Sequence, residues 1–414
     1  MTDRNIGPVG SQGRIETIDV LRGFAILGII FFNMPYISND AMVVFGDIRA
    51  IGWTSADQWT YRIGHVYGAD TMRGMLQILL GAGLMLFARK AMGDDAPAIY
   101  GDIWIRRNLW LAMFGLINVY LLFWVGDILF SYALAAILLF PFRKLSARFL
   151  LGLGIAYLFY KMVNAGLDYR QAVADYKAPA QAGMPAFPDQ HSLPFGQMRA
   201  QGFFGGLEAS ANGWRQAIWA SGQMMSWVIE GAFTMMIGMA LFKWGLVQGE
   251  ASKRFYLMAM IILYAFGLSV RWVLVDQEMN VGSAPIFLET FKAPARLAMT
   301  LGHIALLVWI LKGRGAAMLA WLKAPGRMAF SVYLSESFIC SHILFAPYGF
   351  DLWAKFGWFE GMLASLAIIA FQVAFAHLWL RHFRFGPLEW AWRSLTYWRR
   401  QPIRNADQPQ HYGP

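Results

Sequence analysis

The feature that most constrains the fold of this chain is a series of long apolar segments that recur along most of its length. Each is about 18 residues or longer, the length that an α-helix needs to cross the hydrocarbon core of a bilayer. They lack the strict alternation of apolar and polar residues that is typical of membrane strands, so they predict helices. With 57% apolar and only 14% charged residues, the chain also lacks the polar surface of a soluble domain. The predicted spans are residues 17–37, 72–92, 104–122, 125–143, 147–165, 219–242, 255–276, 295–313, 327–346 and 360–381.

The positions of the basic residues predict how these helices are oriented. Most of the 35 Lys and Arg residues lie in short connections and terminal segments that fall on one side if ten helices alternate. Because cytoplasmic connections are enriched in Lys and Arg, we expect an all-α, polytopic membrane helix bundle of about ten transmembrane helices with both ends in the cytoplasm. The net charge of +10 is explained in this way without a nucleic-acid partner.

Two longer segments, residues 38–71 and 166–218, are predicted on the opposite side of the membrane. The second is rich in Pro, Gly, Ala and Gln and separates five spans from the next five. We therefore expect an N-terminal membrane half over residues 1–165, an outside loop or lid over 166–218, a C-terminal membrane half over 219–400, and a cytoplasmic tail over 401–414.

Three ionisable side chains fall near the middle of predicted spans, where an unpaired charge costs several kcal/mol. They are Glu230, His303 and Glu336. A polar cavity in the second half of the chain would explain them, and a Glu–His pair there could transfer protons. The alternative is a hydrogen-bonded cluster that only fixes helix packing.

Asp19 and Arg22 lie three residues apart at the cytoplasmic start of the first span, and therefore on one helix face. Arg22 could bind a phosphate through two hydrogen bonds, with Asp19 orienting the guanidinium. An ordinary ion pair at the membrane interface is the alternative.

Two candidate residues belong to the outside of the bundle. His65 precedes the second span and is the best-placed base for a substrate that approaches from that side, although a single interfacial His is commonly inert. Asp127 lies in a tight turn between the third and fourth spans, where it either serves a site or caps a helix.

Four blocks of the sequence form a recognisable pattern. They are Ile18-Asp19-Val20-Leu21-Arg22-Gly23-Phe24-Ala25-Ile26-Leu27-Gly28-Ile29; Gly126-Asp127-Ile128-Leu129 with Tyr132-Ala133-Leu134; Gly326-Arg327-Met328-Ala329 with Tyr333-Leu334; and Trp379-Leu380-Arg381 continuing through Phe383-Arg384-Phe385-Gly386-Pro387-Leu388-Glu389-Trp390 to Trp392-Arg393-Ser394-Leu395-Thr396-Tyr397. Together these blocks resemble the YeiB family of bacterial membrane proteins. At two positions the sequence differs from that family's pattern: Asn118 stands where His is expected, and Glu336 where Gln is expected.

The resemblance implies membership of a wider transmembrane acyltransferase group that includes heparan-alpha-glucosaminide N-acetyltransferase. Such enzymes move an acyl group from cytoplasmic acyl-CoA to an acceptor on the far side and use a His. Carried over to this sequence, Asp19 and Arg22 would lie near the donor entrance, and His65 would be the outward-facing His.

The expected function is therefore acyl transfer in the bacterial inner (plasma) membrane, with acyl-CoA as co-substrate, an envelope sugar or lipid as acceptor, and no metal ion. A homodimer is compatible with this interpretation. The alternatives are a proton-coupled transporter or export component that uses Glu230, His303 and Glu336, and a non-catalytic scaffold.

Overall fold

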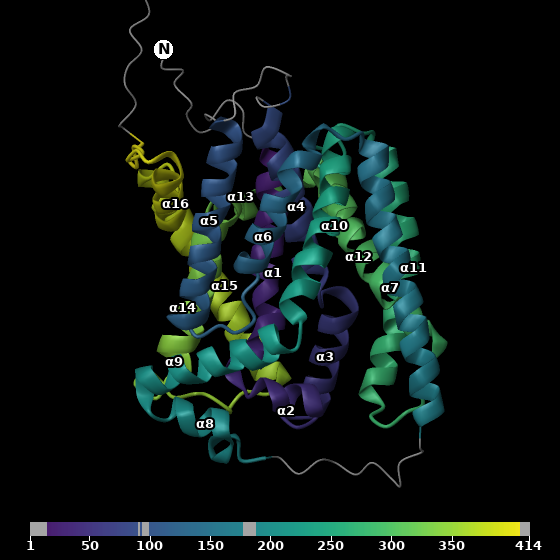
Figure 1. Cartoon of the computed structure of the whole chain (residues 1–414), viewed down its shortest axis with the longest axis vertical. Helices are drawn as coiled ribbons and strands as arrows, with labels where there is room; N and C mark the ends of the chain where they lie inside the picture. The colour runs from purple at the N-terminus through teal and green to yellow at the C-terminus, as the bar shows by residue number, and fades with distance from the viewer. Residues whose placement is uncertain (1–14, 90–91, 93–98, 177–187, 406–414) are drawn as a thin grey trace, which may run out of the picture.

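The chain folds into a bundle of α-helices (Figure 1). The computed structural model describes residues 15–89, 92, 99–176 and 188–405, and these contain no β-strand beyond one isolated bridge between Phe383 and Arg404. The predicted all-α class is confirmed. The helices are α1 Glu16–Ser38, α2 Ala41–Gly46, α3 Ser55–Tyr67, α4 Thr71–Ala88, α5 Ile99–Tyr120, α6 Leu129–Leu139, α7 Ala147–Asp175, α8 Pro194–Arg199, α9 Gly202–Gly213, α10 Gln223–Lys243, α11 Lys253–Met279, α12 Lys292–Leu311, α13 Lys323–Arg327, α14 Ala329–Phe338, α15 Trp358–His382 and α16 Pro387–Tyr397.

Seven helical segments among the described residues are long and apolar enough to cross a membrane, which identifies a multi-pass membrane protein. The other three predicted spans coincide with α5, α6 and α14 and do not meet that criterion: α5 carries charged residues in its first half, while α6 and α14 are short. The count of about ten spans therefore stays a prediction. The seven segments are Glu16–Ser38, Ser55–Ala88, Ala147–Asp175, Gln223–Lys243, Lys253–Met279, Phe287–Leu311 and Trp358–His382.

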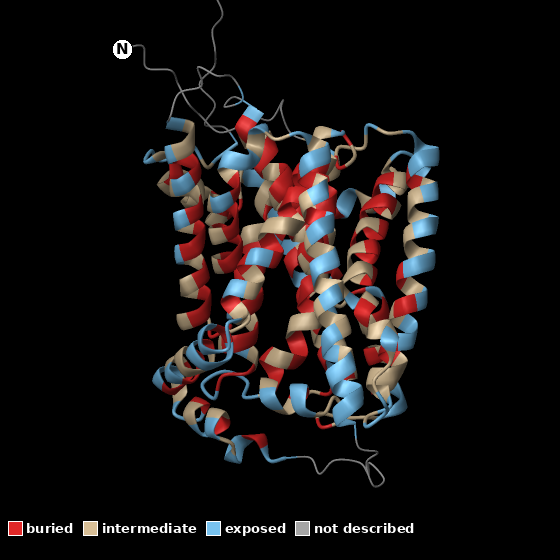
Figure 2. Cartoon of the chain, turned by 45° about the vertical axis from the view of Figure 1, so that its right-hand side comes forward, coloured by how far each residue is buried: buried red, intermediate tan, exposed pale blue. Residues whose placement is uncertain are grey.

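The outer helices carry exposed residues along their outward faces, pale blue in Figure 2, and many of these residues are apolar. Only 11% of the apolar window of α7 and 22% of that of α11 is buried. Phe159 on α7 and Ile262 on α11 are 65% and 63% exposed. Apolar surfaces of this extent would drive aggregation in water, so these faces are suited to contact with lipid.

The bundle has two ends that we name by what they carry. The terminal end, at the top of Figure 1, carries the start of α1 together with α13 and α16. The distal end, at the bottom, carries α2, α3, α8 and α9. Helices α8 and α9 belong to the segment 166–218 that was expected to be an outside loop or lid, and residues 177–187 of that segment lie outside the described residues.

The segment 38–71, expected as a connection, contains two helices. Helix α3 begins with a capping box in which Thr54 and Asp57 each accept a hydrogen bond from the other's backbone. It continues after a short turn into α4, so that Ser55–Ala88 forms one apolar helical segment. The turn ends at Asp70, whose φ of 61° lies in the left-handed region that Asp tolerates better than most residues.

Helix α16 is attached to the first turn of α14 by Glu389. Its carboxylate accepts hydrogen bonds from the backbone nitrogens of Phe330 and Ser331 and from Ser331 Oγ, at 2.8, 3.0 and 2.5 Å. Burial raises the pKa of Glu389 above its usual value. The Trp-rich block of the sequence is thereby fixed against the terminal end of the bundle.

Helices α4 and α10 approach each other most closely through glycines. A Cβ atom on Gly81 would lie 2.0 Å from the Met235 carbonyl oxygen, and one on Gly238 would lie 2.1 Å from that of Ile78. The contact is reciprocal, and backbone atoms on both sides leave no room for a side chain.

We expect Gly81→Val to destabilise the protein by roughly 1–3 kcal/mol or more, because the added side chain must separate α4 from α10. The measurement is the thermal unfolding midpoint of purified protein in detergent. Gly83→Val is the matched control on the same helix, since a Cβ at Gly83 meets no atom within 4 Å. Equal midpoints for the two variants would contradict the close contact.

Candidate functional site

A cavity of about 2220 Å³ occupies the distal half of the bundle. Its walls come from α1, α3, α4, α7, α10, α11, α12 and α15, and its distal side is lined by residues of α2, α8 and α9. Drug-sized ligands occupy pockets of about 300–1,000 Å³, so this cavity can hold a larger molecule.

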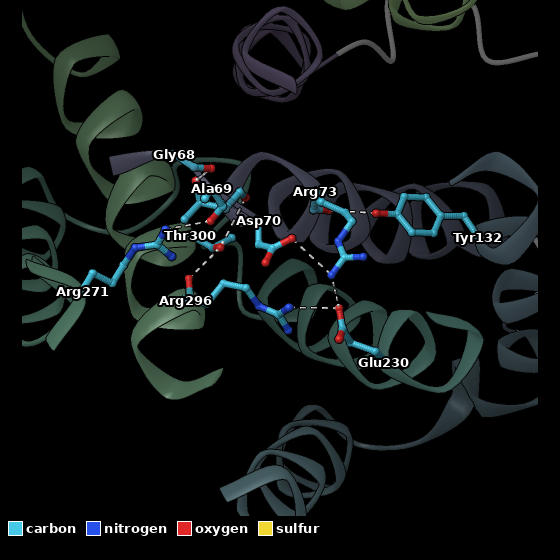
Figure 3. A network of polar contacts seen from close by, with 10 residues as sticks. Gly68, Ala69, Asp70, Arg73, Tyr132, Glu230, Arg271, Arg296 and Thr300 are labelled. Atoms are coloured by element: carbon cyan, nitrogen blue, oxygen red, sulfur yellow. Dashed lines mark hydrogen bonds and ion pairs between the residues drawn. The ribbon is translucent and has the colours of Figure 1, made fainter. Parts of the chain in front are cut away.

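A network of charged side chains crosses the inner wall of the cavity (Figure 3). Glu230 Oε1 on α10 accepts contacts from Arg73 Nη2 on α4 at 3.1 Å and from Arg296 Nη1 on α12 at 3.3 Å. Asp70 Oδ1 lies 3.4 Å from the same Arg73 nitrogen. Tyr132 on α6 donates a hydrogen bond to the Arg73 carbonyl at 3.2 Å. One carboxylate thus joins three helices that are distant in sequence.

Arg271 of α11 fixes the end of α3. Its Nε and Nη2 donate to the carbonyl oxygen of His65, and Nη2 also donates to that of Ala69 at 3.0 Å. Carbonyl groups in the last turn of a helix have no partner within the helix, and Arg271 supplies one. The position of His65 therefore depends on Arg271.

His65 lines the cavity with a defined tautomer. Its Nδ1 lies 2.9 Å from the Tyr61 carbonyl oxygen, which can only accept, so Nδ1 carries the proton. The ring stacks on Tyr61 at 3.8 Å and contacts the edge of Trp358 at 5.4 Å. The lone pair of Nε2 remains for a ligand proton, which is the arrangement of a general base.

His303 is placed differently: it does not line the cavity but lies against two residues that do, Tyr67 and Phe24. Its Nε2 lies 2.7 Å from the Tyr67 carbonyl and its Nδ1 lies 2.6 Å from the Tyr264 hydroxyl. Both ring nitrogens are thus engaged by the protein. The ring also contacts Phe24 of α1 at 6.0 Å, and Phe24 is the lining residue of α1 nearest to the terminal end.

Asp127 and Glu336 lie close to Tyr333 and outside the cavity lining. Asp127 accepts hydrogen bonds from Asn118 Nδ2 at 2.8 Å and from the Phe130 backbone at 2.9 Å, and Tyr333 donates to it at 3.4 Å. The contact with Phe130 is the capping interaction considered for this residue, and Asn118 acts as its partner. Both carboxyl oxygens of Glu336 are buried without a hydrogen-bond partner among the described residues.

Asp19 and Arg22 lie at the terminal end, away from the cavity lining. Arg22 Nη1 is 3.5 Å from Asp19 Oδ1. Helix α13 packs directly against this turn, since a Cβ on Gly326 would lie 1.8 Å from the Asp19 carbonyl oxygen. Of the predicted site residues, the structure therefore brings His65 and Glu230 to the cavity lining. His303 lies behind the lining residues Tyr67 and Phe24, and the other predicted residues lie elsewhere.

The sequence interpretation missed Arg73, Arg271 and Arg296 as site residues. Arg271 and Arg296 lie inside the predicted spans 255–276 and 295–313, where the cost of burying a charge applies to cations as well as to Glu and His. That rule, applied to arginine, would have identified both. No group of three or more His, Cys, Asp or Glu side chains in the described part of the chain is arranged to hold a metal ion.

Comparison with known proteins gives relatives that span nearly the whole chain. Residues 241–399 match a family described as a protein of unknown function, DUF418. The chain is 27% identical to the uncharacterized protein YxaH of Bacillus subtilis, with 96% of this chain and 98% of YxaH covered. It is 26% identical to the uncharacterized protein YeiB of Escherichia coli, with 92% and 96% covered. No solved structure matches.

We expect Glu230→Gln to destabilise the protein by about 3 kcal/mol, because it leaves Arg73 and Arg296 facing each other without their shared carboxylate. Adding Arg296→Gln to this variant should restore part of the loss. The measurement is the unfolding midpoint of the three proteins in detergent. Additive losses in the double variant would show that the ion pairs are not coupled.

Proposed function

Because the chain belongs to the YeiB family of multi-pass membrane proteins, we propose that it is a transmembrane acyltransferase of the bacterial inner membrane, moving an acyl group from cytoplasmic acyl-CoA to an acceptor in the cavity. The observation that carries the proposal is His65. Its side chain lines a cavity large enough for an acceptor. Nδ1 keeps its proton because it donates to the Tyr61 carbonyl oxygen, and the lone pair of Nε2 is available. A neutral His in this state can act as a base.

The chemistry assigned to His65 is proton transfer. Nε2 removes the proton from an acceptor hydroxyl or amine as that atom attacks the thioester carbonyl. The new acyl–oxygen or acyl–nitrogen bond forms, the carbon–sulfur bond breaks, and the proton passes from the imidazolium to the CoA thiolate. The guanidinium of Arg296, which lines the same cavity, supplies positive charge for the developing oxyanion.

The depth of the cavity supports a donor that enters from the terminal end. The cavity reaches Phe24, which is eight residues from the start of α1, or about 12 Å at 1.5 Å per residue. Asp19 and Arg22 lie in that interval. An acyl-CoA bound with its phosphates at Arg22 would have to pass its acyl end beyond the contact between Phe24 and His303.

A transporter is the second candidate, because ionised side chains within a cavity of a membrane bundle also suit a substrate or proton path. The two functions differ in their products. Transport predicts flux into liposomes without any change in the acyl-CoA, whereas acyl transfer predicts release of free CoA.

We expect His65→Gln to lower the rate of CoA release from acyl-CoA by about 10²–10⁴-fold, the range typical of losing a general base. The assay uses purified protein with membrane lipid extract as the acceptor source and free thiol as the readout. His377→Gln is the matched control: its Nδ1 makes the same 2.9 Å contact with a carbonyl four residues earlier, but it lies on the exposed side of α15. Wild-type protein that moves a substrate into liposomes but releases no CoA would contradict acyl transfer.

We expect Arg22→Gln to raise KM for acyl-CoA about tenfold with little change in kcat, since it removes a charged contact to the donor away from the reacting atoms. Initial rates at varied acyl-CoA concentration give both constants. Arg314→Gln, an exposed cation beyond the end of α12, is the control for general charge effects. A fall in kcat with unchanged KM would argue against a donor site at Arg22.

A further inference from the structure

The inner end of the cavity carries more positive than negative side chains. Arg73, Arg271, Lys292 and Arg296 all act electrostatically on Asp70, and each of them lines the cavity. Lys292 is paired with Glu278, and Glu289 also lines the cavity beside it. The surplus of positive charge is therefore local: Arg73, Arg271 and Arg296 lie beside only two carboxylates, those of Asp70 and Glu230. The side chains of Arg73 and Arg296 are only 18% and 21% exposed, so a surplus positive charge there is costly, and a bound anion would compensate it.

The arginines retain donors for such an anion. Arg73 contacts Glu230 and Asp70 through Nη2, and Arg296 contacts Glu230 through Nη1. Within the described chain no protein group pairs with Nε or Nη2 of Arg296, which is a cavity-lining residue. Helix α4 begins at Thr71, so the partial positive charge of its N-terminal end adds to the same region.

Much of the lining along α1, α2 and α3 is apolar, up to the edge of the cavity. Phe45 of α2 and Trp59 and Ile63 of α3 line the cavity and are 70%, 59% and 55% exposed. Deeper along α1, Phe32 and Phe24 line the same space. Large exposed apolar side chains at the edge of a cavity in a membrane bundle suit a hydrocarbon chain that continues into the bilayer.

We propose that the cavity binds a membrane lipid with an anionic, phosphate-type headgroup. The headgroup lies between Arg296 and Arg73, and the hydrocarbon chain lies along α1 and leaves past Phe45, Trp59 and Ile63. The proposal assigns a class of ligand to the cavity in which acyl transfer is proposed to occur. It rests on the proposed function only where it identifies the lipid as the acyl acceptor. The volume of about 2220 Å³ accommodates a ligand of this size.

Binding is tested without acyl-CoA, so the result does not depend on catalysis. The full-length protein in a neutral detergent is titrated with phosphatidylglycerol, with phosphatidylcholine of the same chains, and with glycerol phosphate alone. Native mass spectrometry counts the ligands bound per chain. We expect one phosphatidylglycerol per chain, held about tenfold or more tightly than either of the other two, because only it combines the net negative charge with the apolar chain.

Variants then locate the bound headgroup. Arg296→Gln should weaken phosphatidylglycerol binding about tenfold and leave phosphatidylcholine binding unchanged. The double variant Arg296→Gln and Glu230→Gln should do the same while Arg73 keeps its contact with Asp70, which covers the case in which the single variant folds poorly. Arg215→Gln, an exposed distal cation that does not line the cavity, is the control.

Three outcomes would overturn the proposal. One is equal affinity for the two phospholipids, and another is an equal loss in Arg215→Gln. The third is glycerol phosphate binding as tightly as phosphatidylglycerol, which would identify a soluble anion as the ligand. If the protein binds phosphatidylglycerol selectively but releases no CoA, acyl transfer is contradicted and lipid binding is not.

Discussion

The contact on which the architecture of the cavity depends is the carboxylate of Glu230 held between Arg73 and Arg296. It joins α10, α4 and α12 at the level where the helices separate to form the cavity. Buried charges are stable in such a place only when they are paired, and each of these three residues satisfies the others. The cavity can therefore be wide and still keep its inner wall in one arrangement. The close glycine contact between α4 and α10 lies further along the same helices and supports that arrangement.

Much of the fold could be predicted from the sequence, because lipid contact requires helices of a certain length and the apolar segments meet that length. Each of the ten predicted segments overlaps an observed helix, while the number of helices that cross the membrane stays a prediction. The segment 38–71 was not predicted as helical, since its mixed composition resembles a connection. Helix α3 forms there with its start fixed by the capping box of Thr54 and Asp57, and with Tyr61 and Val66 buried against the bundle. Its junction with α4 at Asp70 depends on local backbone geometry that composition does not encode.

The candidate site was only partly predictable, and the reason lies in how cations were interpreted. Glu230 and His65 were identified because acids and His in or near a span are unusual. Arg271 and Arg296 were not, because positive residues had been treated as markers of orientation. The pairing of Glu230 with Arg73, 157 positions earlier in the chain, is a product of the tertiary fold. The two histidines could be told apart only from the structure. His65 uses one ring nitrogen in its hydrogen bond with Tyr61 and has the other available, whereas His303 uses both, with Tyr67 and Tyr264.

The bond between Arg271 and the last turn of α3 couples two helices mechanically. Arg271 projects from α11, a mostly lipid-facing helix, and its guanidinium binds the backbone of the residue that presents the imidazole. A tilt or rotation of α11 therefore displaces the ring of His65 as well. Bilayer thickness or lateral pressure, which act on lipid-facing helices, would in this way reach the interior through one side chain.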